Sequence, residues 1–214
     1  MNYVLINGIL LDGTEHMEPR MGLAVFVNGE TIEAIRPMEG KAPQGYQVID
    51  LQGKYLMPGL INMHVHLPSS GKPKKKAGNP AKLVKFITSN AFTRKLAYEI
   101  CASMVKTQVL SGVTTLRTIG GILDIDTRIR DDVLAGKLQG PRLLAANTAV
   151  SVEGGHMTGS VAMPAKDIPE AIAMVDRLAE EKVDLIKLMI TGGVLDPLVV
   201  ISHKCTRMKR GQLR

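Results

Sequence analysis

The pattern of hydrophobic and polar positions along the chain changes near Pro58. Before it, apolar stretches are short and are separated by turn residues, which is typical of a small β domain over residues 1–57. Asn28-Gly29 predicts a tight hairpin because both turn positions favour positive φ. Gln52-Gly53 predicts a second, weaker hairpin. The strands expected in this part are 3–11, 22–27, 31–35, 47–51 and 54–57.

After Pro58 the pattern alternates between strand and helix, which favours a parallel sheet with crossover helices. Phe92, Leu96 and Ile100 recur at helical spacing and predict the core-facing side of the first helix. Asp167 is placed as the N-cap of the last helix, with Pro169 in its first turn. We expect strands at 60–67, 113–119, 142–150 and 184–190, and helices at 89–111, 124–138 and 167–182.

Four strands at this spacing fit the first half of a (β/α)8 TIM-type barrel, which typically needs about 250 residues in all. We therefore expect an α/β fold in which residues 58–196 form the amino-terminal half of such a barrel. The periodicity fails after Pro197, and residues 197–214 form an atypical basic tail. This change predicts truncation or a shift of reading frame.

Composition narrows the class of protein only modestly. Of the 214 residues, 45% are hydrophobic but 3% are aromatic, so the core is expected to be aliphatic. The formal net charge of +7 comes largely from clusters at 72–85 and 204–214 that are not interleaved with aromatic residues, so no nucleic-acid partner is expected. Cys101 and Cys205 are interpreted as free thiols. No membrane or targeting segment is recognised, which predicts a cytoplasmic protein, and a homo-oligomer is left open.

His64 and His66 are the first candidates for chemistry. Side chains two apart on a strand lie on the same face, so both imidazoles can reach one cation at about 2.0 to 2.1 Å. The pair lies at the carboxyl end of the first predicted barrel strand, where active sites of this architecture are built. We predict a site for one or two divalent metal ions there, with zinc as the default metal.

Lys187 lies within the otherwise apolar stretch 185–190. One interpretation is structural: the aliphatic part of the side chain packs and the ammonium group reaches solvent at the strand end. The other is functional: a neutral amine captures carbon dioxide as a carbamate and becomes an anionic ligand that can bridge two metals. The position of Lys187 near the carboxyl end of a strand favours the second interpretation.

Two further residues are candidates for binding substrate. His156 follows Gly154-Gly155 after the third predicted strand and could donate a hydrogen bond to a substrate oxygen. Arg117, on the second strand, could pair with a substrate carboxylate. A bare loop histidine is more often structural than functional, and barrel-interior arginines are also commonly structural. Glu153 and Asp196 are interpreted as solvated carboxylates.

Four ordered motifs carry a family resemblance. Residues 57–67, with Pro-Gly-Leu-Ile-Asn-Met-His-Val-His, resemble the Pro-Gly-Leu-Ile-Asp-x-His-x-His signature of the amidohydrolase superfamily. Residues 112–117, 154–156 and 186–193 resemble later landmarks of its prolidase and imidazolonepropionase-like branch. The resemblance implies that residues 1–57 form part of a β-sandwich.

The resemblance implies a metal-activated hydroxide that hydrolyses a C–N bond of amide type in a small-molecule substrate, such as a dipeptide or an N-acyl amino acid. His64 and His66 would bind one metal, and carboxylated Lys187 would bridge to a second, while His156 would contact substrate. Asn62 and Thr118 depart from the pattern, since acidic residues usually stand at both positions. The family also takes two later histidines and a general-base aspartate from strands that this chain lacks, so no catalytic base is assigned.

Two hypotheses follow. In the first, the chain is the amino-terminal portion of a metal-dependent amidohydrolase. In the second, it is a non-catalytic fragment that acts as a structural or interaction module through another chain, because an open half-barrel edge invites pairing.

Overall fold

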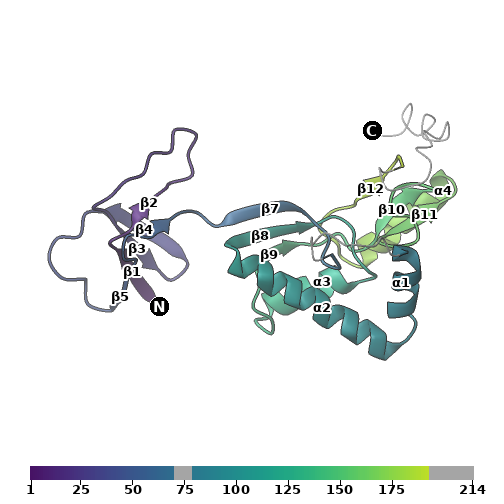
Figure 1. The fold of residues 1–214 in the computed structure, drawn as a ribbon, viewed down its shortest axis with the longest axis horizontal. Coiled ribbons are helices and arrows are strands. Elements are labelled where there is room, and N and C mark those ends of the chain that lie inside the picture. Colours follow the sequence, from purple (N-terminus) through teal and green to yellow (C-terminus); the bar gives the residue numbers. More distant parts are fainter. Residues whose placement is uncertain (70–78, 193–214) are drawn as a thin grey trace. The chain divides into compact units, whose positions relative to one another are not determined.

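A computed structural model describes residues 1–69 and 79–192 of the chain. It divides into two compact units, Met1–Gly59 and Leu60–Arg214 (Figure 1). The predicted basic tail at 197–214, together with Asp196, Cys205 and most of the basic cluster at 72–85, lies outside the described residues. Within 1–69 and 79–192, no helix is long and apolar enough to cross a membrane.

Unit 1 is a β structure built around a four-stranded sheet. The strand order is β4-β3-β1-β5, with β1 antiparallel to β3 and parallel to β5. Val4, Ala24 and Phe26 form its buried centre. The strands are β1 (Asn2–Ile6), β3 (Ala24–Asn28), β4 (Thr31–Arg36) and β5 (Tyr46–Asp50), and a separate parallel pair is made of β2 (Ile9–Leu10) and β6 (Tyr55–Leu56).

The two predicted turns of unit 1 have different outcomes. The hairpin at Asn28-Gly29 is confirmed, since β3 and β4 pair in antiparallel fashion on either side of it. The second hairpin is wrong. Gln52 and Gly53 do adopt positive φ, at 52° and 77°, but the flanking strands β5 and β6 pair with different partners. The predicted strand 3–11 is also broken, because Asn7 turns the chain with φ of 55°.

Unit 2 combines parallel strands with helices. One sheet has the order β7-β8-β9 and another has the order β11-β10-β12, with all pairings parallel. Figure 1 shows α2 and α3 on one face of the β7-β8-β9 sheet. The strands are β7 (Leu60–Val65), β8 (Val113–Thr118), β9 (Arg142–Leu144), β10 (Ala149–Val152), β11 (Ala162–Ala165) and β12 (Leu188–Met189), and the helices are α1 (Pro80–Ile87), α2 (Ala91–Leu110), α3 (Ile125–Leu134) and α4 (Ile168–Glu180).

The helices differ from the prediction mainly in the face that α2 buries. Its buried side carries small residues such as Ala97 and Cys101, whereas Phe92, Leu96 and Ile100 are exposed. The N-cap of α4 is confirmed, since the carboxylate of Asp167 accepts the main-chain N–H of Glu170 at 2.9 Å. Sequence periodicity missed α1 and the short strand β11.

The predicted third strand, 142–150, is two strands joined by a bend at Asn147. Asn147 is fully buried with φ of 55°. Its carbonyl oxygen Oδ1 accepts the main-chain N–H of Thr127 at 3.0 Å, and its Nδ2 donates to the Glu181 carboxylate at 2.8 Å. Asn147 therefore ties the bend to the start of α3 and the end of α4.

Replacing Asn147 by alanine is expected to lower the free energy of unfolding by about 2–4 kcal/mol, because the buried Thr127 and the half-buried Glu181 lose their hydrogen bonds and alanine disfavours positive φ. Urea denaturation of the two proteins measures the difference. Asn147→Gly is the control, since glycine adopts this φ freely and loses only the hydrogen bonds. A loss below about 1 kcal/mol in both variants would contradict this role of the side chain.

Candidate metal centre

Four of the five candidate residues share the side of the sheets that faces away from the helices. Val65 packs into the core between the β7-β8-β9 sheet and α2 and α3, so the alternating His64 and His66 lie on the opposite face. By the same alternation, Leu116 faces the helices and Arg117 faces away. Ile186 packs with the residues beside α4, which leaves the neighbouring Lys187 on the other side.

The two histidines lie next to each other at the end of β7. Their ring centroids are 5.5 Å apart and the rings are inclined by 70°. His66 Nδ1 donates to the carbonyl oxygen of Gly120 at 2.9 Å, since a carbonyl can only accept. This bond fixes the tautomer of His66 and leaves Nε2 with the lone pair that a metal needs.

The loop after β8 is shaped to hold His66. Gly120 has φ of 130°, and a Cβ at this position would lie 3.3 Å from Cε1 of the His66 ring. Only glycine combines this backbone conformation with the close approach of the imidazole. In the sequence, the signal for this close approach is the Gly120-Gly121 pair directly after the predicted strand 113–119.

Burial and nearby positive charges, among them Lys187 and Arg117, affect the pKa of His64. Partial burial of the ring lowers the pKa of His64 below its ordinary value of 6.5. The charges of His66, Lys187 and Arg117 lower this pKa further. A lowered pKa keeps the imidazole neutral near neutral pH, which is the protonation state that binds a metal. The same charges also show that Lys187 and Arg117 lie within electrostatic range of His64.

Lys187 lies in a different setting from the predicted buried strand. The side chain is half-buried, the next residue, Leu188, is 53% exposed, and among the described strands β12 lies at the edge of its sheet. The Lys187 carbonyl accepts the main-chain N–H of Val150 at 2.9 Å, which holds the backbone against β10.

Arg117 and His156 each make a hydrogen bond to a main-chain carbonyl. Nε of Arg117 donates to the Met63 carbonyl at 2.9 Å, and within 1–69 and 79–192 the terminal nitrogens make no hydrogen bond or ion pair. The main-chain N–H of His156 donates to the Thr191 carbonyl at 3.0 Å. This contact brings the loop after β10 beside the end of β12, the strand that follows Lys187.

Asp126 is a buried carboxylate next to the Gly120-Gly121 loop, and the sequence patterns did not predict it. Asp126 is fully buried at the start of α3, and within the described residues neither oxygen makes a hydrogen bond of ordinary geometry. A Cβ added to Gly121 would lie 2.5 Å from Oδ1 of Asp126, so the carboxyl group packs directly on the loop. Burial raises the pKa of Asp126 to about 6, and the nearby Thr118 hydroxyl and Asn147 N–H lower it to a smaller extent.

The ligand set fits a divalent cation only in part. His64 and His66 are a suitable pair of nitrogen donors, and Lys187 lies near them. In the part of the chain that is described, no group of three or more His, Cys, Asp or Glu side chains could hold a metal ion. The face can therefore supply two imidazoles and one lysine, and a complete binding site requires further ligands.

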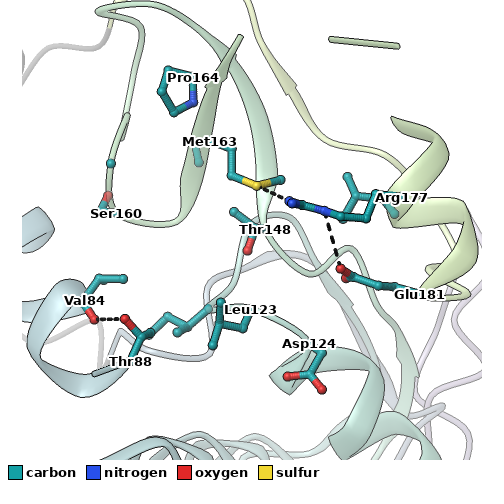
Figure 2. A pocket seen from close by; sticks show the side chains of 14 residues that line it. Val84, Thr88, Leu123, Asp124, Thr148, Ser160, Met163, Pro164, Arg177 and Glu181 are labelled. Carbon is teal, nitrogen blue, oxygen red and sulfur yellow. Dashed lines mark hydrogen bonds and ion pairs between the residues drawn. The ribbon is translucent and has the colours of Figure 1, made fainter. Parts of the chain in front are cut away.

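A pocket of about 600 Å³ lies elsewhere in unit 2 (Figure 2). It is lined by residues of α1, the β8–α3 loop, β11 and α4, and it includes none of the five candidates. Arg177 and Glu181 form an ion pair along its wall at 3.8 Å. We place the candidate site on the histidine face, because the His64 and His66 rings lie side by side there.

Comparison with known proteins decides the family. A sequence profile described as the amidohydrolase family matches residues 55–200. The chain belongs to the amidohydrolase family. The resemblance predicted from the four motifs is therefore confirmed. The chain is 38% identical to a dihydroorotase from Bacillus pumilus over 76 residues, which cover 36% of this chain and 17% of that protein.

Solved structures of the amidohydrolase family share the fold. A crystal structure of an amidohydrolase matches with a TM-score of 0.75 and 25% identity over 93% of this chain and 49% of that chain. A prolidase complexed with N-methylphosphonate-L-proline matches with a TM-score of 0.76 and 24% identity, over 94% of this chain and 50% of that one. The chain thus spans about half the length of these two proteins.

Proposed function

We propose that the chain is the amino-terminal portion of a metal-dependent amidohydrolase that hydrolyses a C–N bond of amide type. Leu60 to Gly192 would form the first half of a (β/α)8 barrel, and residues 1–57 part of a β-sandwich. One observation carries the proposal: His64, His66, Arg117 and Lys187 share the sheet face opposite the helices. Catalytic residues of such barrels come from the carboxyl ends of several strands.

His64 and His66 would hold one divalent cation, with zinc as the default, and Lys187 as its carbamate would bridge to a second. A bound cation would polarise the scissile carbonyl and lower the pKa of water toward neutrality. Within this chain, Gly120 holds the His66 ring through the hydrogen bond at Nδ1. Partial burial and, to a smaller extent, the cationic neighbours lower the pKa of His64, which favours its neutral form, and conversion of Lys187 to an anion would remove one of the two positive charges beside it.

Arg117 would select the substrate class. Its Nε is held by the Met63 carbonyl, which directs the guanidinium along the histidine face and keeps its terminal nitrogens for a ligand. A guanidinium binds a carboxylate through two parallel hydrogen bonds. This favours a dipeptide or an N-acyl amino acid, both of which carry a free carboxylate. His156, in the loop beside Thr191, would contact the same substrate.

Hydrolysis of a panel of dipeptides, N-acyl amino acids and cyclic amides by the chain joined to the remaining half of the barrel, with added zinc or manganese, tests the proposal. We expect metal-dependent turnover that falls at least about 100-fold in Lys187→Ala. Lys106→Ala is the matched control, because Lys106 is an exposed residue of α2, and it should keep full activity. Bound metal without turnover of any substrate would instead support the alternative below.

The alternative is a non-catalytic fragment that acts as a structural or interaction module. Exposed apolar side chains at the sheet edges favour it: Ile61 on β7 is 63% exposed and Leu188 on β12 is 53% exposed. Among the described strands of unit 2, β7 to β12, none carries an aspartate that could be the general base implied by the family. The turnover measurement separates the two functions.

A further inference from the structure

The two glycines of the loop after β8 are required for different reasons. Gly120 has φ of 130°, a backbone conformation that other residues rarely adopt. Gly121 lies outside the positive-φ region, so its backbone does not demand glycine. The three atoms nearest to a Cβ added there, at 2.5 to 2.7 Å, all belong to the carboxyl group of Asp126. The close packing of Asp126 is therefore what requires glycine at position 121.

One peptide unit of this loop connects His66 to the bend at Asn147. The Gly120 carbonyl accepts the Nδ1–H of His66 at 2.9 Å. The N–H of the same peptide unit, which belongs to Gly121, donates to the Asn147 carbonyl at 2.7 Å. Because a peptide unit is planar and rigid, a shift at Gly121 also moves the carbonyl that holds the His66 ring.

Asp126 lies against this peptide unit on a fixed support. Its side chain is fully buried at the start of α3. The next residue, Thr127, donates its main-chain N–H to Oδ1 of Asn147 at 3.0 Å. The loop and the start of α3 are thus anchored to the same bend, with the Asp126 carboxyl group packed on Gly121. A close-packed interior transmits a change of volume to its neighbours.

We propose that Asp126 is a positioning residue for His66: its carboxyl group holds the Gly120–Gly121 peptide unit where the carbonyl keeps the proton of His66 on Nδ1 and leaves Nε2 for a metal. The metal rests on the proposed function, whereas the ring geometry belongs to the metal-free chain. Asp126 acts through its shape, since among the described residues its oxygens find no hydrogen bond of ordinary geometry. An amide of the same shape therefore serves equally well.

Nitrogen NMR of the metal-free full chain tests the inference, because it shows which ring nitrogen of a neutral histidine carries the proton. The His66 signal is assigned by its loss in His66→Gln, and spectra are recorded at mildly alkaline pH. We expect the Nδ1–H form to dominate in the wild type and in Asp126→Asn. In Asp126→Ala the ratio of the Nδ1–H to the Nε2–H form should fall at least about 5-fold, as expected when one hydrogen bond is lost.

Val105→Ala is the matched control. Val105 is fully buried, and a Cβ added to Gly140 would lie 2.8 Å from its Cγ1. Gly140 precedes β9, whereas the glycine loop follows the parallel strand β8, so this cavity opens at the opposite end of the strands. The control should keep the wild-type ratio. An equal fall in Val105→Ala and Asp126→Ala would mean a general loosening of the core and would overturn the inference.

A compensating pair of substitutions gives a sharper test that does not depend on the folding of Asp126→Ala alone. Gly121→Ala pushes the loop away from the carboxyl group, so it should also lower the ratio at least about 5-fold. In the double variant Gly121→Ala, Asp126→Ala, the new methyl group occupies space that the carboxyl group has left. The ratio should therefore return toward that of the wild type. A double variant that falls as far as Gly121→Ala, or further, contradicts the proposed contact.

Titration of Zn²⁺ separates this inference from the proposed function. Zinc affinity should fall about 10- to 100-fold in Asp126→Ala and stay unchanged in Asp126→Asn, since partners behind a metal ligand have effects of this size. A wild-type chain that binds no zinc but shows the expected NMR pattern would count against the proposed function alone. Folded Asp126→Ala and Gly121→Ala variants with the wild-type ratio would overturn the positioning role, whether or not zinc binds.

Discussion

Replacing His66 by alanine is expected to lower the affinity of the chain for Zn²⁺ by at least about 100-fold, more than the loss of an outer-shell partner usually costs. His66 is the better-oriented of the two candidate donors, because its Nδ1 is held by the Gly120 carbonyl at 2.9 Å and its Nε2 is left for the metal. The ring also has little freedom to rotate, since Gly120 lies against it.

Isothermal titration of Zn²⁺ into both proteins measures the loss. His16→Ala is the control: His16 is an exposed histidine of unit 1, and its removal changes the number of histidines without touching the site. Equal weakening in the His16→Ala and His66→Ala variants would mean that zinc binds histidines nonspecifically, and the pair on β7 would lose its assignment.

Ionisation of Asp126 is expected to reduce the free energy of unfolding by roughly 3 kcal/mol between pH 4 and pH 8, at about 1.4 kcal/mol per unit of pKa shift. Burial raises the pKa of this carboxyl from 3.8 to about 6. A group whose pKa is higher in the folded state stabilises the protein below its unfolded-state pKa. That stability is lost as the pH rises through 6, where the folded protein must hold a buried anion.

Urea denaturation as a function of pH tests this expectation. Asp126→Asn cannot ionise at this position. The free energy of unfolding of the variant should therefore rise relative to that of the wild type between pH 4 and pH 7. Asp124→Asn, at an exposed position two residues earlier, is the matched control and should follow the wild type. If wild type and Asp126→Asn run in parallel across this range, the carboxyl group is stabilised by a partner that the structure does not reveal.

Local signals in the sequence predicted the elements that depend on local chemistry. Asn28-Gly29 forms its hairpin because both residues favour the turn conformation, and Asp167 caps α4 because its side chain reaches a main-chain N–H three residues on. The histidine pair was placed on one face by strand alternation alone, and the structure has both rings on that face. These features require no knowledge of distant contacts.

Features that depend on tertiary contacts could not be predicted in the same way. Two stripes on α2 have the same helical spacing, one of bulky residues and one of small residues that includes Ala97 and Cys101. The small residues face the sheet because they let the helix approach closely, so size misled the prediction. The bend at Asn147 depends on hydrogen bonds to Thr127 and Glu181, which are 20 and 34 positions away along the chain.

In the candidate site too, some residues could be predicted from local sequence and others could not. His64, His66, Arg117 and Lys187 could be named from strand position, whereas Asp126 could not, because an acidic residue near a helix start is usually solvated. Its burial follows from Gly121, which has no side chain to keep the carboxyl group away. Sequence alone also offered no sign that Lys187 lies beside an exposed edge strand.

Zinc K-edge X-ray absorption of the zinc-loaded chain tests the central claim most directly, because it reports the atoms bound to the metal. The account predicts imidazole scattering from two nitrogen ligands at about 2.0–2.1 Å. The imidazole signal should fall in the double variant His64→Ala, His66→Ala and persist in His16→Ala. A spectrum without imidazole scattering, or one that the double variant leaves unchanged, would contradict a metal site on this face.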